Sequence, residues 1–192
     1  MAEQAKEAFI FDLDGTLVDS VYQHVLAWHE ALTAVGIEMS VWRIHRRIGM
    51  SGGLLTRALM RESNIPVTDE MGERLRALHA DAYLRRKDQV RPLPGAKALL
   101  RQLSEARFPW AIATSGRMET ARATVATLEV DVERCVLITR DMVRHAKPNP
   151  DLFLAAAERL GVPIASSFVV GDSVWDLLAA TRAGALGIGL LS

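Results

Sequence analysis

The sequence of 192 residues has a single cysteine, Cys135, and no excess charge of either sign. One cysteine excludes an internal disulfide and is typical of a reducing compartment. Lys and Arg together number 23, as do Asp and Glu, which gives no support to nucleic-acid binding. No stretch reaches the roughly 18 apolar residues of a membrane span, and the first eight residues lack a signal-like apolar segment. We therefore expect a cytoplasmic protein, by default a monomer, with no nucleic-acid or membrane partner.

What the sequence does contain is the pattern of an α/β protein. Hydrophobic residues make up 49% and charged residues 24%, which is ordinary for a globular chain. A short apolar strand is expected at 8–13. After residue 92, strands are expected at 109–114, 135–139, 167–171 and 185–190, alternating with helices at 95–106, 118–128, 150–160 and 174–183. This alternation predicts a parallel sheet with helices on both faces.

The stretch between these two parts has only helical patterns. Helices are expected at 20–36, 40–48, 52–63 and 68–88, the first of them starting at Ser20. The segment Arg91–Gly95, with two prolines and a glycine, marks the boundary. We therefore predict that 1–18 and 92–192 form the α/β core and that 19–91 is an inserted all-helical unit.

Two acidic residues follow the first strand. Asp12 and Asp14 are expected to share a face, because side chains at i and i+2 of a strand point the same way. Gly15 permits a sharp turn behind them. Such a pair shares a proton or binds a cation. An N-cap or Asx turn at a strand–helix junction explains an isolated pair equally well.

Further polar groups follow the later strands. Thr114, Ser115 and Gly116 offer a hydroxyl and free backbone N–H groups at the start of a helix, which suit an anionic oxygen. Lys147 stands in the stiff stretch Ala146–Pro150, where its ammonium can act as a point charge. Alone, these residues could be an N-cap and a surface lysine.

Asp172 and Asp176 follow the strand expected at 167–171 and lie one helical turn apart. By themselves they could cap a helix and favour its dipole. However, the carboxyl ends of parallel strands meet at one edge of a sheet, where ligands bind. The carboxylates, the lysine and the hydroxyl are all expected at that edge, and they form a suitable site for a divalent cation and a phosphoryl group.

Four segments occur in the order FDLDGTLVDS, ATSG, AKPNPD and VVGDSVWD. In these motifs the chain resembles the haloacid dehalogenase-like hydrolase superfamily, especially its phosphoglycolate phosphatase and beta-phosphoglucomutase-like group. The resemblance spans nearly the whole chain and implies a Rossmann-like core. It also implies that 19–91 is a helical cap of the first cap type, joined by hinge strands at 16–20 and 91–95, which closes over the site.

The resemblance implies phosphate-ester hydrolysis through an aspartyl-phosphate. In this family the residue matching Asp12 is the nucleophile, and the one matching Asp14 is general acid and then base. Thr114 matches the hydroxyl that holds the phosphate, with Ser115 and Gly116 beside it. Lys147 matches the lysine that neutralises nucleophile and phosphate.

A magnesium ion is the cofactor that the resemblance implies. Its ligands would be Asp12, the backbone carbonyl of Asp14, and Asp172, with Asp176 in the outer shell. Ligand sets made only of oxygen favour a hard cation such as Mg²⁺ over zinc.

Substrate contacts are expected from the cap. His24 lies close to the catalytic loop, although it could be merely a packed histidine. Arg47 precedes the glycine-rich stretch Gly49–Gly53, which lets backbone approach a ligand. Most other cap arginines are expected on solvated helix faces.

Departures from related families narrow the chemistry. Asp14 argues against dehalogenation, and the lack of lysine in 20–86 argues against a Schiff-base phosphonoacetaldehyde hydrolase. Beta-phosphoglucomutases usually have DGV where this chain has DGT, and their cap-loop arginine falls at Gly52. We therefore expect a phosphatase acting on a small phosphorylated metabolite, of phosphoglycolate or sugar-phosphate type. The alternatives are beta-phosphoglucomutase-like transfer and, less favoured, a non-catalytic module that binds a phosphorylated metabolite.

Overall fold

A five-stranded parallel sheet forms the centre of the protein, in the order β5-β4-β1-β6-β7. The computed structural model describes residues 6–63, 68–131 and 135–192. The strands are β1 Ala8–Phe11, β4 Trp110–Ala113, β5 Val136–Ile138, β6 Ser167–Gly171 and β7 Leu186–Gly189. β1 lies in the middle and pairs in parallel with β4 on one side and β6 on the other. The predicted α/β fold class is confirmed.

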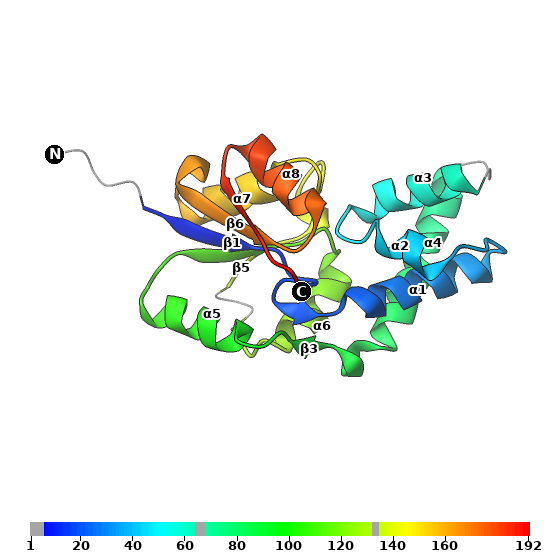
Figure 1. Ribbon diagram of the computed structural model, residues 1–192, viewed down its shortest axis with the longest axis horizontal. Helices are drawn as coiled ribbons and strands as arrows, with labels where there is room; N and C mark the ends of the chain where they lie inside the picture. The colour runs from blue at the N-terminus through cyan, green and yellow to red at the C-terminus, as the bar shows by residue number, and fades with distance from the viewer. Residues whose placement is uncertain (1–5, 64–67, 132–134) are drawn as a thin grey trace.

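Helices cover both faces of this sheet (Figure 1). They are α5 Ala96–Glu105, α6 Met118–Ala126, α7 Asp151–Leu160 and α8 Val174–Ala183. On one face Phe11 packs with Leu100 of α5 and Val125 of α6. On the other face Ile10 packs with Phe153 of α7. Neighbouring residues of β1 thus pack into the two apolar clusters on opposite faces of the sheet. This explains why the strand is apolar throughout.

Between β1 and α5 the chain forms a second group of helices, which lies to the right of the sheet in Figure 1. These are α1 Val21–Ala34, α2 Val41–His45, α3 Gly52–Glu62 and α4 Asp69–Leu84. They share an apolar cluster that includes Trp28, Leu59 and Leu75. Two short strands, β2 Val18–Asp19 and β3 Arg91–Pro92, pair antiparallel where the chain passes between the two groups.

The positions of β2 and β3 agree with a boundary near residues 18 and 92. That 19–91 forms a separate domain stays a prediction. Of the predicted segment 1–18, residues 1–5 lie outside the described part. None of the helices in the described residues is long and apolar enough to cross a lipid bilayer.

Several element ends differ from the expected ones. The helix expected at 40–48 ends at His45, because the chain turns there and Gly49 takes a φ of +91°. The helix expected at 68–88 ends at Leu84 and is followed by a 3₁₀ turn, Lys87–Gln89. Ser20 does precede α1, but its hydroxyl makes no cap bond because it donates to Asp14.

Two leucines of α7 provide a test of this packing. Leu152 is fully buried against the sheet, whereas Leu154 on the same helix is 42% exposed. Leu152→Ala should lower the free energy of unfolding by about 2–5 kcal/mol, because it leaves a cavity. Leu154→Ala should change it by about 0.5 kcal/mol or less. Urea unfolding of both variants measures the difference, and equal losses would contradict this placement of α7.

Candidate active site

The site lies at the carboxyl ends of three adjacent strands. Asp12 directly follows β1, and its backbone N–H donates to the carbonyl of Val170 in β6 at 2.8 Å. Thr114 follows β4 and Asp172 follows β6. Because β4, β1 and β6 are neighbours in the sheet, residues distant in the sequence meet here.

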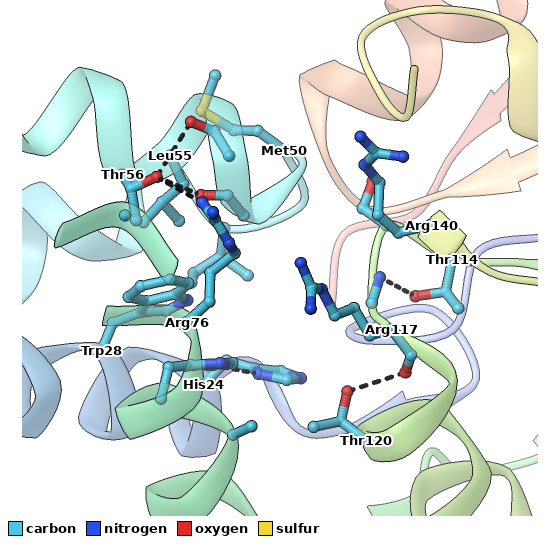
Figure 2. Close-up of a pocket in the computed structure, with 18 of the residues that line it drawn as sticks. His24, Trp28, Met50, Leu55, Thr56, Arg76, Thr114, Arg117, Thr120 and Arg140 are labelled. Atoms are coloured by element: carbon cyan, nitrogen blue, oxygen red, sulfur yellow. Dashed lines mark hydrogen bonds between the residues drawn. The ribbon is translucent and has the colours of Figure 1, made fainter. Parts of the chain in front are cut away.

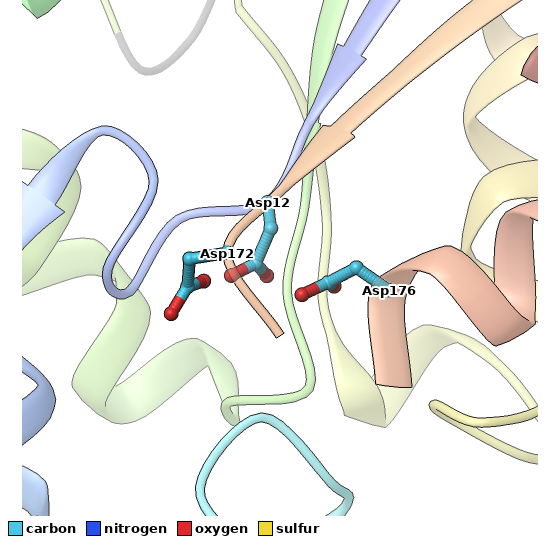
Figure 3. Close-up of side chains that lie close together, drawn as sticks. All are labelled: Asp12, Asp172 and Asp176. Atoms are coloured by element: carbon cyan, nitrogen blue, oxygen red, sulfur yellow. The ribbon is translucent and has the colours of Figure 1, made fainter. Parts of the chain in front are cut away.

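Three of the predicted carboxylates form a tight cluster (Figure 3). Oxygen atoms of Asp12, Asp172 and Asp176 all lie within 4.8 Å of one another. Burial raises the pKa of Asp12 well above its ordinary value; Lys147 opposes this rise, and the charges of Asp176 and Asp172 add to it. Burial also raises the pKa of Asp172. Such a cluster is suited to a hard cation held by oxygen ligands.

Lys147 provides the positive charge beside this cluster. Its side chain is fully buried, and Nζ contacts Oδ1 of Asp12 and, at 2.7 Å, Oδ1 of Asp176. Burial alone would lower the pKa of Lys147, but Asp12 and Asp176 outweigh it and raise the pKa above its ordinary value. The two carboxylates therefore favour the charged form of Lys147 and hold it against Asp12.

Both carboxylate oxygens of Asp176 already have protein partners. Oδ1 pairs with Lys147, and Oδ2 accepts hydrogen bonds from the backbone N–H and hydroxyl of Ser173. Ser173 and Asp176 form a capping box at the start of α8. Asp176 thus holds Lys147 in place, as suits a residue that would stand behind the direct ligands of a metal.

Asp14 is not part of the three-carboxylate cluster and is held by a separate set of hydrogen bonds. Ser20 donates to its Oδ1 at 2.6 Å, and Nε2 of His24 lies 3.2 Å from the same oxygen. Burial raises the pKa of Asp14, but the charge and hydrogen bond of His24 and the hydrogen bond of Ser20 bring the pKa below its ordinary value. These hydrogen bonds therefore favour the ionised form of Asp14.

His79 of α4 extends this chain of contacts and was not found by sequence reasoning. Its Nε2 lies 3.1 Å from Nδ1 of His24. A carboxylate only accepts hydrogen bonds, so Nε2 of His24 is the donor to Asp14, and the contact between His24 and His79 joins the two rings. The two histidines are 55 residues apart, and no local pattern signals the contact.

The loop after β4 has the features expected for holding an anion. Thr114 is buried, and its Oγ1 accepts a hydrogen bond from the backbone N–H of Gly116 at 2.9 Å. The hydroxyl of Ser115 is buried without a hydrogen-bond partner among the described residues. A buried hydroxyl is costly unless a ligand or water satisfies it. All three residues line the same cavity as Asp12 and Asp14.

This cavity has a volume of about 680 Å³ and lies between the sheet edge and the helices α1, α3 and α4. Figure 2 shows Thr114 and Arg117 on the sheet side, facing Arg76 and Thr56 on the helical side. His24 lines the cavity, in agreement with its predicted position near the ligand.

Arg47 is not where the sequence analysis expected it. Arg47 is not one of the described residues that line this cavity. Its guanidinium pairs with Glu62 and donates to the carbonyl of Arg43 at 2.7 Å. Gly49 has a positive φ, and the glycine-rich loop that begins there borders the cavity, whereas Arg47 borders a separate hollow. The arginines that do line it are Arg57, Arg76, Arg117 and Arg140.

Gly15 is tightly packed against the acidic cluster and provides a test of it. Its φ is +90°, and a Cβ built there would lie 2.3 Å from Oδ2 of Asp172. Gly36 has a similar φ of +77° with no atom within 4 Å of its Cβ position. Gly36→Ala should cost about 1–2 kcal/mol of stability for the left-handed backbone alone. Gly15→Ala should cost about 1–3 kcal/mol more, because Asp172 must move.

Chemical denaturation of the two glycine variants measures this difference. Because the backbone penalty is common to both, the excess in Gly15→Ala reports the packing against Asp172 and, more weakly, against Val21, whose Cγ2 would lie 2.8 Å from the new Cβ. Equal losses would show that Asp172 does not lie against Gly15.

His79 should make the stability of the protein depend on pH. Burial lowers the pKa of its imidazole well below the ordinary value, and the charge of His24 adds to this, with Asp14 opposing. Below about pH 6.5 the unfolded chain binds a proton at this residue that the folded chain does not. The free energy of unfolding should therefore fall as pH falls, by at most about 1.4 kcal/mol per pH unit from this group. We expect the free energy of unfolding, measured with urea between about pH 7.5 and pH 5.5, to depend less steeply on pH in His79→Gln than in the wild type. The same pH dependence in both proteins would contradict a buried neutral imidazole at His79.

Comparison with known proteins gives consistent matches. A family model described as haloacid dehalogenase-like hydrolase matches residues 6–184. Hexitol phosphatase A of Escherichia coli (strain K12) is 33% identical over 190 residues, covering 93% of this chain and 80% of that protein. Phosphoglycolate phosphatase of Vibrio vulnificus (strain CMCP6) is 29% identical over 200 residues, covering 99% and 86%. The crystal structure of a hydrolase from Pseudomonas syringae, 52% identical, aligns with a TM-score of 0.92 over 97% of this chain and 84% of that one.

Proposed function

Because this chain belongs to the haloacid dehalogenase-like hydrolases, we propose that it is a Mg²⁺-dependent phosphatase that hydrolyses a small phosphorylated metabolite through an aspartyl-phosphate on Asp12. The family and the phosphatase type of enzyme predicted from the four motifs are confirmed. The residue roles, the metal and the substrate are the proposal. The observation that carries it is the fixed contact of Asp12 with Lys147, at a cavity that Thr114 and Asp14 also line.

The first step requires a carboxylate to approach an anionic phosphoryl group. Asp12 is the proposed nucleophile, since a covalent intermediate divides a difficult hydrolysis into two easier steps. Like charges repel, so positive charge must stand beside the reacting atoms. Lys147 supplies this charge through its contact with Oδ1 of Asp12. The hydroxyls of Thr114 and Ser115 and the N–H groups of their loop would hold the phosphoryl oxygens.

Asp14 is the proposed proton carrier. It must give a proton to the leaving alcohol and then take one from the attacking water. The second task requires the ionised form of Asp14, which the hydrogen bonds from Ser20 and His24 favour. An arriving phosphate dianion raises the pKa of a neighbouring carboxyl group, which suits the first. Ser20 and His24 keep the carboxylate in position for both.

The donor set fits Mg²⁺. Asp12 and Asp172 present clustered carboxylate oxygens, and the backbone carbonyl of Asp14 would complete the protein ligands. Asp176 would stay outside the direct ligands, because its oxygens already bind Lys147 and Ser173. When bound, the ion supplies positive charge for the phosphoryl oxygens.

A small metabolite is the proposed substrate class. The cavity of about 680 Å³ lies in the range that binds small molecules. The curated relatives named above act on a hexitol phosphate and on phosphoglycolate, as their names state. The helices of 19–91 form one wall of the cavity, which supports the proposal that they act as a cap that excludes water.

Replacing the nucleophile tests this function. Asp12→Asn should reduce Mg²⁺-dependent release of phosphate from p-nitrophenyl phosphate by at least about a thousandfold, because the amide cannot attack phosphorus. Asp88→Asn, a change in the 3₁₀ turn after α4, should keep full activity. Activity retained in purified Asp12→Asn would contradict the mechanism.

A second experiment separates a phosphatase from a mutase. With β-glucose 1-phosphate as substrate, free orthophosphate indicates a phosphatase, whereas glucose 6-phosphate indicates a mutase.

A further inference from the structure

Charged side chains that pair with one another form part of the lining of this cavity, which we call the charged wall. Glu73 and Arg76 lie on α4, Arg117 directly precedes α6, and Asp141 lies in the 3₁₀ turn Arg140–Met142 that follows β5. All four line the cavity. They come from both sides of it, the helical group and the sheet edge, so a ligand that fills the cavity would meet all of them.

Glu73 is the centre of these pairs. Its Oε1 lies 2.6 Å from Nη2 of Arg76, and its Oε2 lies 3.5 Å from Nη2 of Arg117. Nε of Arg117 lies 3.8 Å from Oδ1 of Asp141. Asp141 is fixed in turn, because its Oδ2 accepts a hydrogen bond from the backbone N–H of Met118 at 2.8 Å. Figure 2 shows Arg76 and Arg117 extending from opposite sides into the space between the two groups.

The charges of this wall balance. Apart from Asp12 and Asp14, the cavity is lined by four arginines and four acidic residues, namely Arg57, Arg76, Arg117, Arg140, Asp69, Glu73, Glu119 and Asp141. Positive and negative side chains are thus equal in number, so this part of the lining has no formal net charge. Arginine recognises a carboxylate or phosphate through its fork of N–H donors. In Arg76 and Arg117, parts of that fork already face Glu73 and Asp141.

The balance determines which ligand tails the wall accepts. A second anionic group would meet the carboxylates of Glu73 and Asp141, and it would have to compete with them for the arginines. A neutral polyhydroxylated tail meets no such repulsion, since its hydroxyls can donate to the carboxylates and accept from the guanidinium groups. The cavity also has more volume than a two-carbon tail requires.

We propose that this wall selects phosphate monoesters whose remaining part is a neutral polyol or sugar, and that Glu73 determines this specificity by neutralising Arg76 and Arg117. The inference rests on the proposed phosphatase function and narrows its substrate class. It disfavours phosphoglycolate, sugar-acid phosphates and bisphosphates, each of which has a second negative charge.

Two substrates of nearly equal size test the inference. Glucitol 6-phosphate and 6-phosphogluconate have the same carbon chain, but the second ends in a carboxylate. The wild-type kcat/KM should favour glucitol 6-phosphate by about tenfold or more. Glu73→Gln frees positive charge and should lower this ratio by about tenfold, through a gain with 6-phosphogluconate. Arg117→Gln leaves extra negative charge and should raise the ratio.

The two variants therefore move the ratio in opposite directions, and either one keeps the test intact if the other fails to fold. Glu70→Gln is the matched control, because Glu70 lies on the same helix but does not line the cavity. Its ratio should equal that of the wild type.

The outcomes separate the inference from the proposed function. A wild-type enzyme that hydrolyses p-nitrophenyl phosphate but prefers 6-phosphogluconate overturns the inference alone. So does a Glu73→Gln ratio equal to that of Glu70→Gln. No turnover of any of these esters by the wild type overturns the phosphatase function and the inference together.

Discussion

The buried ammonium of Lys147 is the constraint on which the rest of the site depends. An unpaired charge in the interior costs several kcal/mol, so Lys147 requires both Asp12 and Asp176. This requirement ties together the end of β1, the segment before α7 and the first turn of α8. The position of Asp12 is therefore set by the sheet from one side and by charge from the other. In the proposed role of nucleophile, a carboxylate held in this way needs little reorganisation when a phosphoryl group arrives.

The same cluster also contacts the helical group. The carbonyl of Lys147 accepts a hydrogen bond from the backbone N–H of Ser51 at 3.2 Å, and Ser51 caps α3. A Cβ on Gly49 would lie 2.6 Å from Oγ of Ser173, whose hydroxyl binds Asp176. The loop before α3 thus rests directly on the residues that orient Lys147. The helices thus contact the proposed catalytic residues directly, in addition to being joined to the core through the strands β2 and β3.

What could be read from the sequence follows from topology. Asp12, Thr114 and Asp172 were predicted to meet because each follows a strand, and β4, β1 and β6 proved to be neighbours. The helical contributions could not be read in this way. His79 contacts His24 only because α4 packs against α1, and Glu73 faces Arg117 only because α4 also approaches α6. Arg47 was misplaced because the turn at Gly49 decides which side of the loop borders the cavity, and that turn is not encoded in the spacing of charged residues.

The acidic cluster and the charged wall of the cavity differ in net charge. Asp12, Asp172 and Asp176 with Lys147 leave 3 − 1 = 2 negative charges when all are ionised, which a divalent cation would offset. The charged wall of the cavity is already balanced within the protein. Its pairs are partly exposed, with the side chains of Glu73 and Arg117 62% and 49% accessible, so they add about 0–1 kcal/mol to stability. The arrangement of these ion pairs is therefore better explained by the proposed selection of ligands than by a contribution to the stability of the fold. A buried hydrogen bond joins α4 to α6 instead, between the hydroxyl groups of Tyr83 and Thr124 at 2.6 Å, and it is better placed to stabilise the packing of these helices.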